Sequence, residues 1–102
     1  MNRWDVWIAD VPFEDIPAIL KARPVLIMDN AVIVLGVFKM TSHSQRDALD
    51  YEIVEYKAAG LPLATVVRLS KYLILDAVHF RHPIGRLASI DIVAIQKLLS
   101  NL

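Results

Sequence analysis

The most constraining feature of this sequence is a series of short apolar runs, each ended within a few residues by proline, glycine or a polar pair. Two of them, residues 24–28 and 32–40, are separated by little more than Asp29 and Asn30, which are residues that favour turns. Runs of this length, rich in β-branched and aromatic side chains, are typical of strands. The middle of the chain therefore predicts two antiparallel strands joined near Asp29 and Asn30.

The same reasoning predicts further strands over residues 4–11, 51–56 and 65–69 and a short element within residues 72–80. The polar or proline-containing stretches between these runs are expected to be connections. Residues 79–83, which end at a proline, are expected to form a solvated turn.

The end of the chain has the spacing of an amphipathic helix. Ser89 is expected to cap it and Asp91 suits its first turn, while an apolar face repeats at Ile92, Ile95, Leu99 and Leu102. Several short strands followed by a helix predict a mainly β fold that fits a small, strongly curved barrel. Spacing alone leaves an OB-like barrel or a small sandwich open.

Length and composition limit the architecture. A chain of 102 residues is enough for one compact domain, here residues 1–102. Its apolar content is 56%, above the roughly 45–50% usual for soluble domains. The excess predicts a self-association face or a partner groove. No apolar run reaches the ~18 residues of a membrane span, and no cysteine is present. With no signal-like start, we expect a cytoplasmic protein.

Charge is balanced overall but segregated along the sequence. The formal net charge is +0, which argues weakly against a nucleic-acid partner. Basic residues nevertheless dominate residues 21–46 and 68–86, and acidic residues dominate 1–20 and 47–67. A fold that joins the two basic blocks would create a basic face on a neutral protein.

Candidate chemistry lies at the ends of the two central strands. Arg23 precedes Pro24, which holds it extended, and its guanidinium offers a fork of donors suited to phosphate oxygens. Thr41 and Ser42 end the next apolar run, and hydroxyls there can hydrogen-bond a phosphate. His43 follows with a side chain apt for carrying protons near neutral pH. These residues predict a phosphate site at one end of the sheet.

Each residue also has a plainer reading. Arg23 can form an ion pair with Glu14 or its neighbour, and Thr41 can bond its own loop backbone, which is common at strand ends. Arg46 can pair with Asp50 instead of a phosphate. His43 can be an ordinary exposed loop residue.

In its order and spacing the chain resembles the PemK/MazF family of toxin endoribonucleases. The residues that carry the resemblance are Arg-Pro at 23–24, Thr-Ser at 41–42, and the stretches 67–71 and 84–87. It extends from about residue 4 to the C-terminus. The resemblance implies an SH3-like barrel and the toxin half of a toxin–antitoxin pair. It also implies sequence-selective cleavage of single-stranded RNA by 2′-hydroxyl attack, without metal or other cofactor, by a homodimer that binds a cognate antitoxin.

Carried over residue by residue, the resemblance implies catalytic roles for Arg23 and Thr41, with His43 as an optional proton carrier. The basic and hydroxyl side chains expected to bind RNA are Lys21, Ser42, Arg46, Arg68 and Lys71.

The sequence departs from the family pattern in two places. The loop before Arg23 lacks the usual carboxylate, so Glu14 or Asp15 would have to replace it, and a late Glu-Gln pair is absent. These gaps leave a rival interpretation open, a non-catalytic SH3-like module that binds RNA or peptide.

The predicted turn also creates a geometric difficulty. A tight turn at Asp29 and Asn30 would place Arg23 opposite Gly36, which leaves Thr41 about 17 Å further along its strand. A later turn, a bulge or strong coiling of the strands is needed to bring Arg23 and Thr41 together.

Overall fold

We describe the fold from a computed structural model that covers residues 1–102. It consists of strands, one short 3-10 turn and a C-terminal helix. Their bounds are β1 Asp5–Pro12, β2 Leu20–Asn30, β3 Val34–Thr41, β4 Asp50–Glu52, β5 Val66–Asp76, η1 Ala77–His79, β6 Phe80–Arg86 and α1 Ser89–Ser100.

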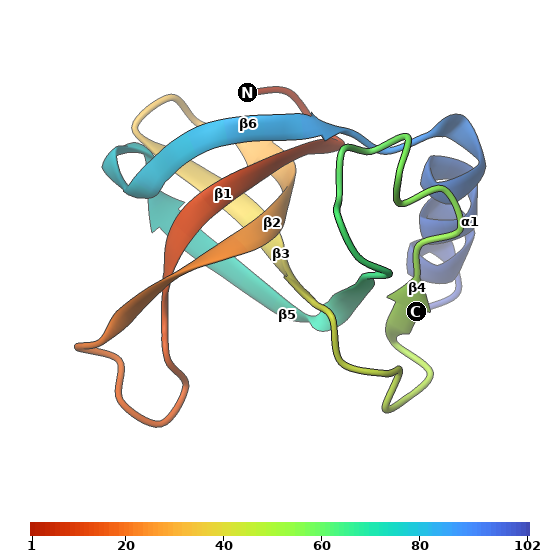
Figure 1. Cartoon of the computed structure of the whole chain (residues 1–102), viewed down its shortest axis with the longest axis horizontal. Helices are drawn as coiled ribbons and strands as arrows, with labels where there is room; N and C mark the ends of the chain where they lie inside the picture. Colours follow the sequence, from red (N-terminus) through yellow and green to blue (C-terminus); the bar gives the residue numbers. More distant parts are fainter.

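The six strands form one antiparallel sheet in the order β4-β5-β3-β2-β1-β6. Figure 1 shows the sheet strongly bent, with α1 and β4 together at one end of the molecule. Because β4 and β6 are both edges, hydrogen bonds do not close the sheet into a complete barrel. The predicted mainly β fold with a C-terminal helix is confirmed. No helix is long and apolar enough to span a membrane.

The turn between β2 and β3 lies later than predicted, so its assignment to Asp29 and Asn30 is wrong. The Asn30 side-chain oxygen accepts a hydrogen bond from the Val32 amide at 2.7 Å. This local bond leads the chain into a turn in which the Ala31 amide donates to the Val34 carbonyl at 3.0 Å. Asn30 therefore initiates the turn from the end of β2 and does not form its centre.

A bulge in β2 at residues 28–29 completes the change of register. Beyond it, Val25 lies opposite Lys39. The same register continued for two residues places Arg23 opposite Thr41. The later turn and the bulge thus remove the separation of about 17 Å that the predicted turn imposed.

β5 is one long, bent strand, where the sequence predicted a strand at 65–69 and a separate short element within 72–80. Its pairing with β3 skips residues 69–71, so three residues of β5 have no partner there. The skip bends β5 sharply and turns Lys71 toward the β1–β2 loop, whose Glu14 it contacts.

The two edge strands also differ from the prediction. β6 begins at Phe80 and runs through residues 80–83, where a turn was expected, and Pro83 pairs with Trp7. Proline is tolerated there because an edge strand does not need every amide for the ladder. β4 covers only Asp50–Glu52, and turns replace the rest of the predicted strand at 51–56.

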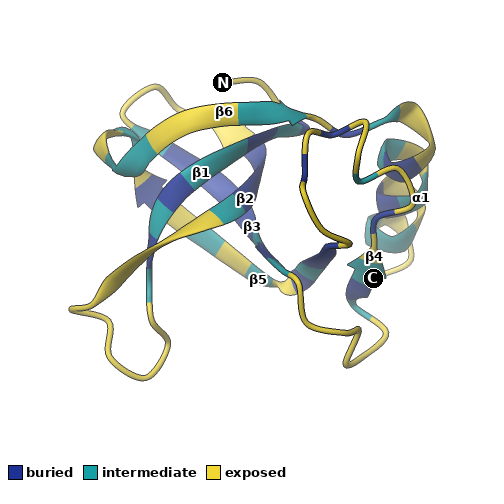
Figure 2. Ribbon diagram, viewed as in Figure 1, coloured by how far each residue is buried: buried dark blue, intermediate teal, exposed yellow.

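Both faces of the central strands are buried, as the dark stretches of β2 and β3 in Figure 2 show. In β2, Val25 and Ile27 join one apolar cluster, while Leu26 and Met28 join another that also contains Ile95 of α1. The bent sheet encloses the first cluster, and α1 helps to cover the second. Burial on both faces accounts for part of the high apolar content.

A buried carboxylate anchors the start of α1. Asp91 is fully buried and accepts hydrogen bonds from the Tyr51 hydroxyl at 2.5 Å and the amides of Val54 and Glu55 at 2.8 and 3.0 Å. Ser89 does not cap the helix as predicted, because the N-cap residue is Ala88 and it makes no side-chain cap bond. Asp91 instead serves the turns after β4.

We expect Asp91→Ala to lower the free energy of unfolding by about 3 kcal/mol, because it strands two amides and a hydroxyl away from water. Urea denaturation monitored by circular dichroism measures the change. Asp76→Ala, which removes an exposed carboxylate, is the control and should unfold close to wild type. Equal stability of the two variants would contradict this role for Asp91.

Candidate functional site

A groove with a volume of about 660 Å³ lies at the end of the sheet where β2 begins and β3 ends. The β1–β2 loop, the loop after β3 and the loop before β5 form its walls. Val25, Met40 and Leu61 supply buried apolar lining. Its charged side chains are mostly basic: Lys21, Arg23, Lys39, Arg46 and Arg68 face two carboxylates, Glu14 and Asp15.

The groove gathers residues that are far apart in sequence. All of the predicted site residues except Lys71 line it: Lys21, Arg23, Thr41, Ser42, His43, Arg46 and Arg68. Lys71 is connected to it through an ion pair with Glu14. Basic residues of the block 21–46 and Arg68 of the block 68–86 therefore share one groove, whereas Arg81 and Arg86 pair with Asp10 and Asp5 outside it. The catalytic and binding roles of these residues stay predictions.

Arg23 is exposed and forms no ion pair, so its plainer reading as a partner of Glu14 is wrong. Pairing with Ala9 of β1 holds its backbone in an extended strand. The guanidinium keeps its five N–H donors available at the groove.

Thr41 is half-buried at the end of β3, and its hydroxyl oxygen accepts a hydrogen bond from the His43 amide at 3.1 Å. Thr41 therefore does bond the backbone of its own loop, as its alternative structural role predicted. Accepting this bond leaves the hydroxyl proton free to donate to another oxygen. The same bond fixes the first residues of the loop that carries the exposed His43 ring.

A buried carboxylate supports the far wall of the groove. Asp50 is buried in β4 directly opposite Arg68 of β5, with its Oδ1 atom 3.5 Å from the Arg68 Nε. Its other oxygen accepts the Arg46 amide at 2.9 Å, and its carbonyl accepts the Gln45 amide group at 2.6 Å. Asp50 therefore holds both Arg68 and the loop of Arg46, through the Arg46 backbone and not its guanidinium.

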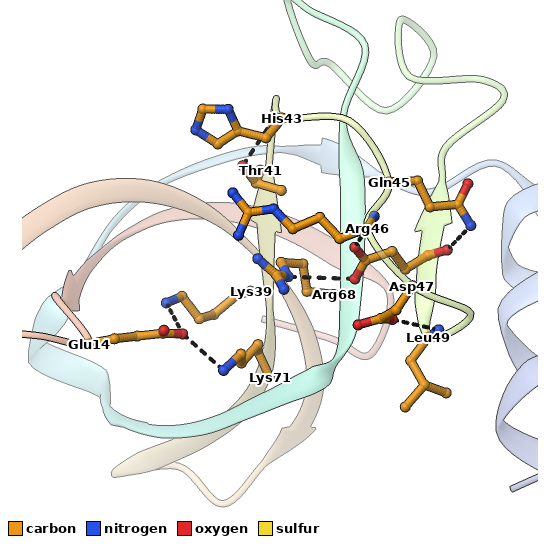
Figure 3. Close-up of polar contacts among 11 residues, drawn as sticks. Glu14, Lys39, Thr41, His43, Gln45, Arg46, Asp47, Leu49, Arg68 and Lys71 are labelled. Atoms are coloured by element: carbon orange, nitrogen blue, oxygen red, sulfur yellow. Dashed lines mark hydrogen bonds and ion pairs between the residues drawn. The ribbon is translucent and has the colours of Figure 1, made fainter.

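One of the two acidic side chains that line the groove is already engaged. Glu14, from the β1–β2 loop, places one oxygen 3.3 Å from the Lys39 Nζ and 3.3 Å from the Lys71 Nζ, as Figure 3 shows. The hydrogen bonds and positive charges of Lys71 and Lys39 lower the pKa of Glu14. Sequence reasoning did not assign a role to Lys39, and only its position two residues before Thr41 signalled it.

We expect the carboxyl group of Glu14 to titrate below the usual range and Lys71→Met to raise its pKa. A depressed pKa means that the contacts stabilise the fold at pH values above the ordinary carboxyl range. They are lost as pH falls through the lowered pKa of Glu14. Side-chain 13C chemical shifts of Glu14 followed against pH in the wild type and in Lys71→Met measure this. A Glu14 that titrates in the ordinary glutamate range in both proteins would refute the ion pairs in solution.

Comparison with known protein families identifies one family that matches this chain. The family described as PemK-like, MazF-like toxin of type II toxin-antitoxin system matches residues 2–102. A comparison with curated proteins found no similar sequence.

Solved structures share the fold. A mycobacterial endoribonuclease in complex with its cognate antitoxin is 15% identical with a TM-score of 0.77, covering 99% of this chain and 92% of that chain. A second mycobacterial endoribonuclease is 15% identical with a TM-score of 0.74, covering 99% and 88% of the two chains. The Mycobacterium tuberculosis toxin MazF-mt6 is 21% identical with a TM-score of 0.70, covering 93% of each chain. These likenesses show the fold, and the family match extends over nearly the whole sequence, so this chain belongs to the PemK-like, MazF-like toxins of type II toxin–antitoxin systems.

Proposed function

We propose that this chain is a toxin endoribonuclease that cleaves single-stranded RNA at selected sequences, without a metal ion, and that residues 1–102 act as one catalytic domain. The observation that carries the proposal is that Arg23 and Thr41 both line one basic groove, just beyond the last pair of β2 and β3, Val25 with Lys39. Family membership and the likeness to structures described as endoribonucleases support it.

The proposed reaction is an internal transfer within the RNA. The 2′-oxygen loses its proton and bonds to the adjacent phosphorus, while the bond from phosphorus to the 5′-oxygen breaks and that oxygen gains a proton. The products are a 2′,3′-cyclic phosphate and a 5′-hydroxyl. Because the nucleophile belongs to the substrate, the protein has to stabilise charge and move protons.

The groove residues divide these tasks. Arg23 stabilises the negative charge that develops on the phosphate oxygens and is the candidate donor to the leaving 5′-oxygen. Thr41 positions the phosphate through its free hydroxyl proton, and His43 is an optional proton carrier. Lys21, Ser42, Arg46, Arg68 and Lys71 bind the RNA on either side.

We expect Arg23→Ala and Thr41→Ala each to reduce cleavage of a mixed single-stranded RNA at least about a hundredfold while leaving the fold intact. A loss of this size is typical when one stabilising donor is removed. Gel analysis of products in the presence of a chelator measures cleavage, and circular dichroism checks folding.

Arg81→Ala is the matched control, since Arg81 is an exposed arginine that pairs with Asp10 outside the groove. It should cleave like wild type. Full activity of a folded Arg23→Ala variant would remove the central claim of the proposal.

The rival function is a module that binds RNA or peptide without cutting. One observation favours it: Glu14, which would replace the missing loop carboxylate, is held by Lys39 and Lys71. RNA binding without products in the chelator experiment would establish the module. Cleavage that requires added metal would reject the metal-independent mechanism.

We further propose that the chain works in the cytoplasm as a homodimer and binds a cognate antitoxin. Exposed apolar side chains on adjacent segments support self-association, namely Val32, Ile33, Ile74 and Val78. A two-fold dimer would carry two grooves on one assembly. An antitoxin segment that folds on binding can cover the same groove as RNA.

Light scattering at micromolar concentration should report a dimer, and antitoxin should displace labelled RNA in a competition assay. A shared groove makes the two ligands mutually exclusive, and the basic lining makes RNA binding weaken as salt rises. A clean monomer would contradict the dimer. Simultaneous, independent binding of both ligands would contradict the shared groove.

A further inference from the structure

We propose that Lys39 and Lys71 form a separate phosphate subsite, which Glu14 fills in the free protein and leaves when an RNA backbone phosphate enters. The identity of the ligand as RNA rests on the proposed function. The existence of an anion site between the two lysines rests on geometry alone.

The geometry is that of a small anion site already in use. The Nζ atoms of Lys39 and Lys71 each lie 3.3 Å from the same oxygen of Glu14. Two ammonium groups that converge on one oxygen provide donors for a phosphate oxygen equally well, because both acceptors are anionic oxygens. Glu14 thus marks the position that a phosphate oxygen would occupy.

The two lysines come from strands of the sheet. Lys39 lies on the central strand β3, where its side chain is 23% exposed, and Lys71 lies at the unpaired bend of β5 with a side chain that is 39% exposed. Glu14 belongs to the β1–β2 loop, and its side chain is 56% exposed. The anion between the two cations is therefore the most exposed of the three partners and comes from a loop, which makes it the replaceable one.

The subsite lies beside the proposed scissile position and is distinct from it. Lys39 and Thr41 are two residues apart on β3, so their side chains share one face at a spacing of about 7 Å. Arg23 lies just beyond the last pair of β2 and β3, Val25 with Lys39, and lines the same groove as Thr41. An extended strand can thus present one phosphate to Arg23 and Thr41 and another to Lys39 and Lys71.

Internal competition has a consequence for affinity. Each RNA that binds must displace Glu14. The free energy of the contacts between Glu14 and the two lysines is therefore subtracted from the free energy of RNA binding. Removing the Glu14 charge should then strengthen binding, and only while both lysines are present. This dependence separates a subsite from a general change in surface charge.

The test is fluorescence anisotropy with a labelled 2′-O-methyl oligoribonucleotide, which cannot undergo 2′-hydroxyl attack. We expect Glu14→Gln to bind it roughly two- to fivefold more tightly than wild type, the size of one exposed ion pair. Asp15→Asn removes a neighbouring carboxylate of the groove that no lysine holds, and should give a smaller change.

The double variant Lys39→Gln/Lys71→Gln should bind the oligoribonucleotide more weakly than wild type. The slope of the logarithm of its binding constant against the logarithm of salt concentration should become shallower by about 0.7, the value for one lost phosphate contact. In that background, Glu14→Gln should no longer strengthen binding. An unchanged or weaker affinity of the single Glu14→Gln variant would overturn the subsite. An equal gain in affinity from Asp15→Asn would also overturn the subsite. So would a Glu14→Gln variant that binds poly-glutamate more tightly than wild type but does not bind the oligoribonucleotide more tightly.

A second measurement keeps the subsite testable if the protein does not act on RNA. Titration with inorganic pyrophosphate, followed by side-chain NMR signals, should shift Lys39, Lys71 and Glu14 in wild type. Absence of these shifts would overturn the subsite even if RNA is cleaved. Their presence in a protein that neither binds nor cleaves RNA would retain the anion site and reject the proposed function.

Discussion

The pairing of β2 with β3 is the constraint on which the rest of the structure depends. These two strands carry the continuous apolar stretch of the core on both faces, and they also end at the groove. The bulge at residues 28–29 sets which side chains meet there, because a shift of one residue would send Arg23 and Thr41 to different faces.

The register is in turn secured by polar contacts at the bulge: Asp29 accepts hydrogen bonds from Tyr72 at 2.6 Å and from Arg3 at 3.0 Å. The bond to Asp29 raises the pKa of the Tyr72 hydroxyl to about 12, so the hydroxyl remains a donor well above neutral pH. The core and the candidate site therefore share one register, which a contact far from the groove helps to fix.

The other half of the molecule has little regular structure and depends on buried carboxylates. The region after β3 contains only the short strand β4 before β5 begins, so many backbone amides have no ladder partner. Asp50 accepts one of them from the loop at Arg46, and Asp91 accepts two from the turns after β4. The three donors to Asp91 compensate its burial, and the carboxylate in turn satisfies amides that would otherwise be costly to bury. Asp50 also faces Arg68 at 3.5 Å, so the element that organises the loop also orients a cation of the groove.

The sequence predicted the strand content, the terminal helix and most of the groove, because those depend on local patterns. Apolar runs of strand length, the extended residue before Pro24 and hydroxyls at a strand end are all visible in a window of a few residues. What it did not predict depends on contacts between distant segments. Asn30 was expected at the centre of the turn because the preference of asparagine for turns is a property of the residue alone. Its actual position at the end of β2 depends on the register of two strands. Pro83 was expected to break structure, but on an edge strand its missing amide costs no ladder bond. The pairing of Glu14 with Lys39 and Lys71 joins residues up to 57 positions apart, and no local pattern announces it.

A neutral chain can present a basic groove only if its acidic residues are used elsewhere, and the ion pairs show how this is done. On the rest of the surface, Arg3, Arg81 and Arg86 are each matched by an aspartate. In the groove, Lys21, Arg23 and Arg46 have no such partner, and Arg68 faces a carboxylate that is buried beneath it. Outside the groove these arginines are neutralised by aspartates, whereas three of the groove's cations, at the end of the sheet where β2 begins and β3 ends, have no ion-pair partner. Net charge taken over the whole sequence hides this arrangement because it averages over positions that the fold separates. Cations from the two basic blocks of the sequence come together only because the bend of β5 brings Arg68 and Lys71 toward the strand that carries Lys39.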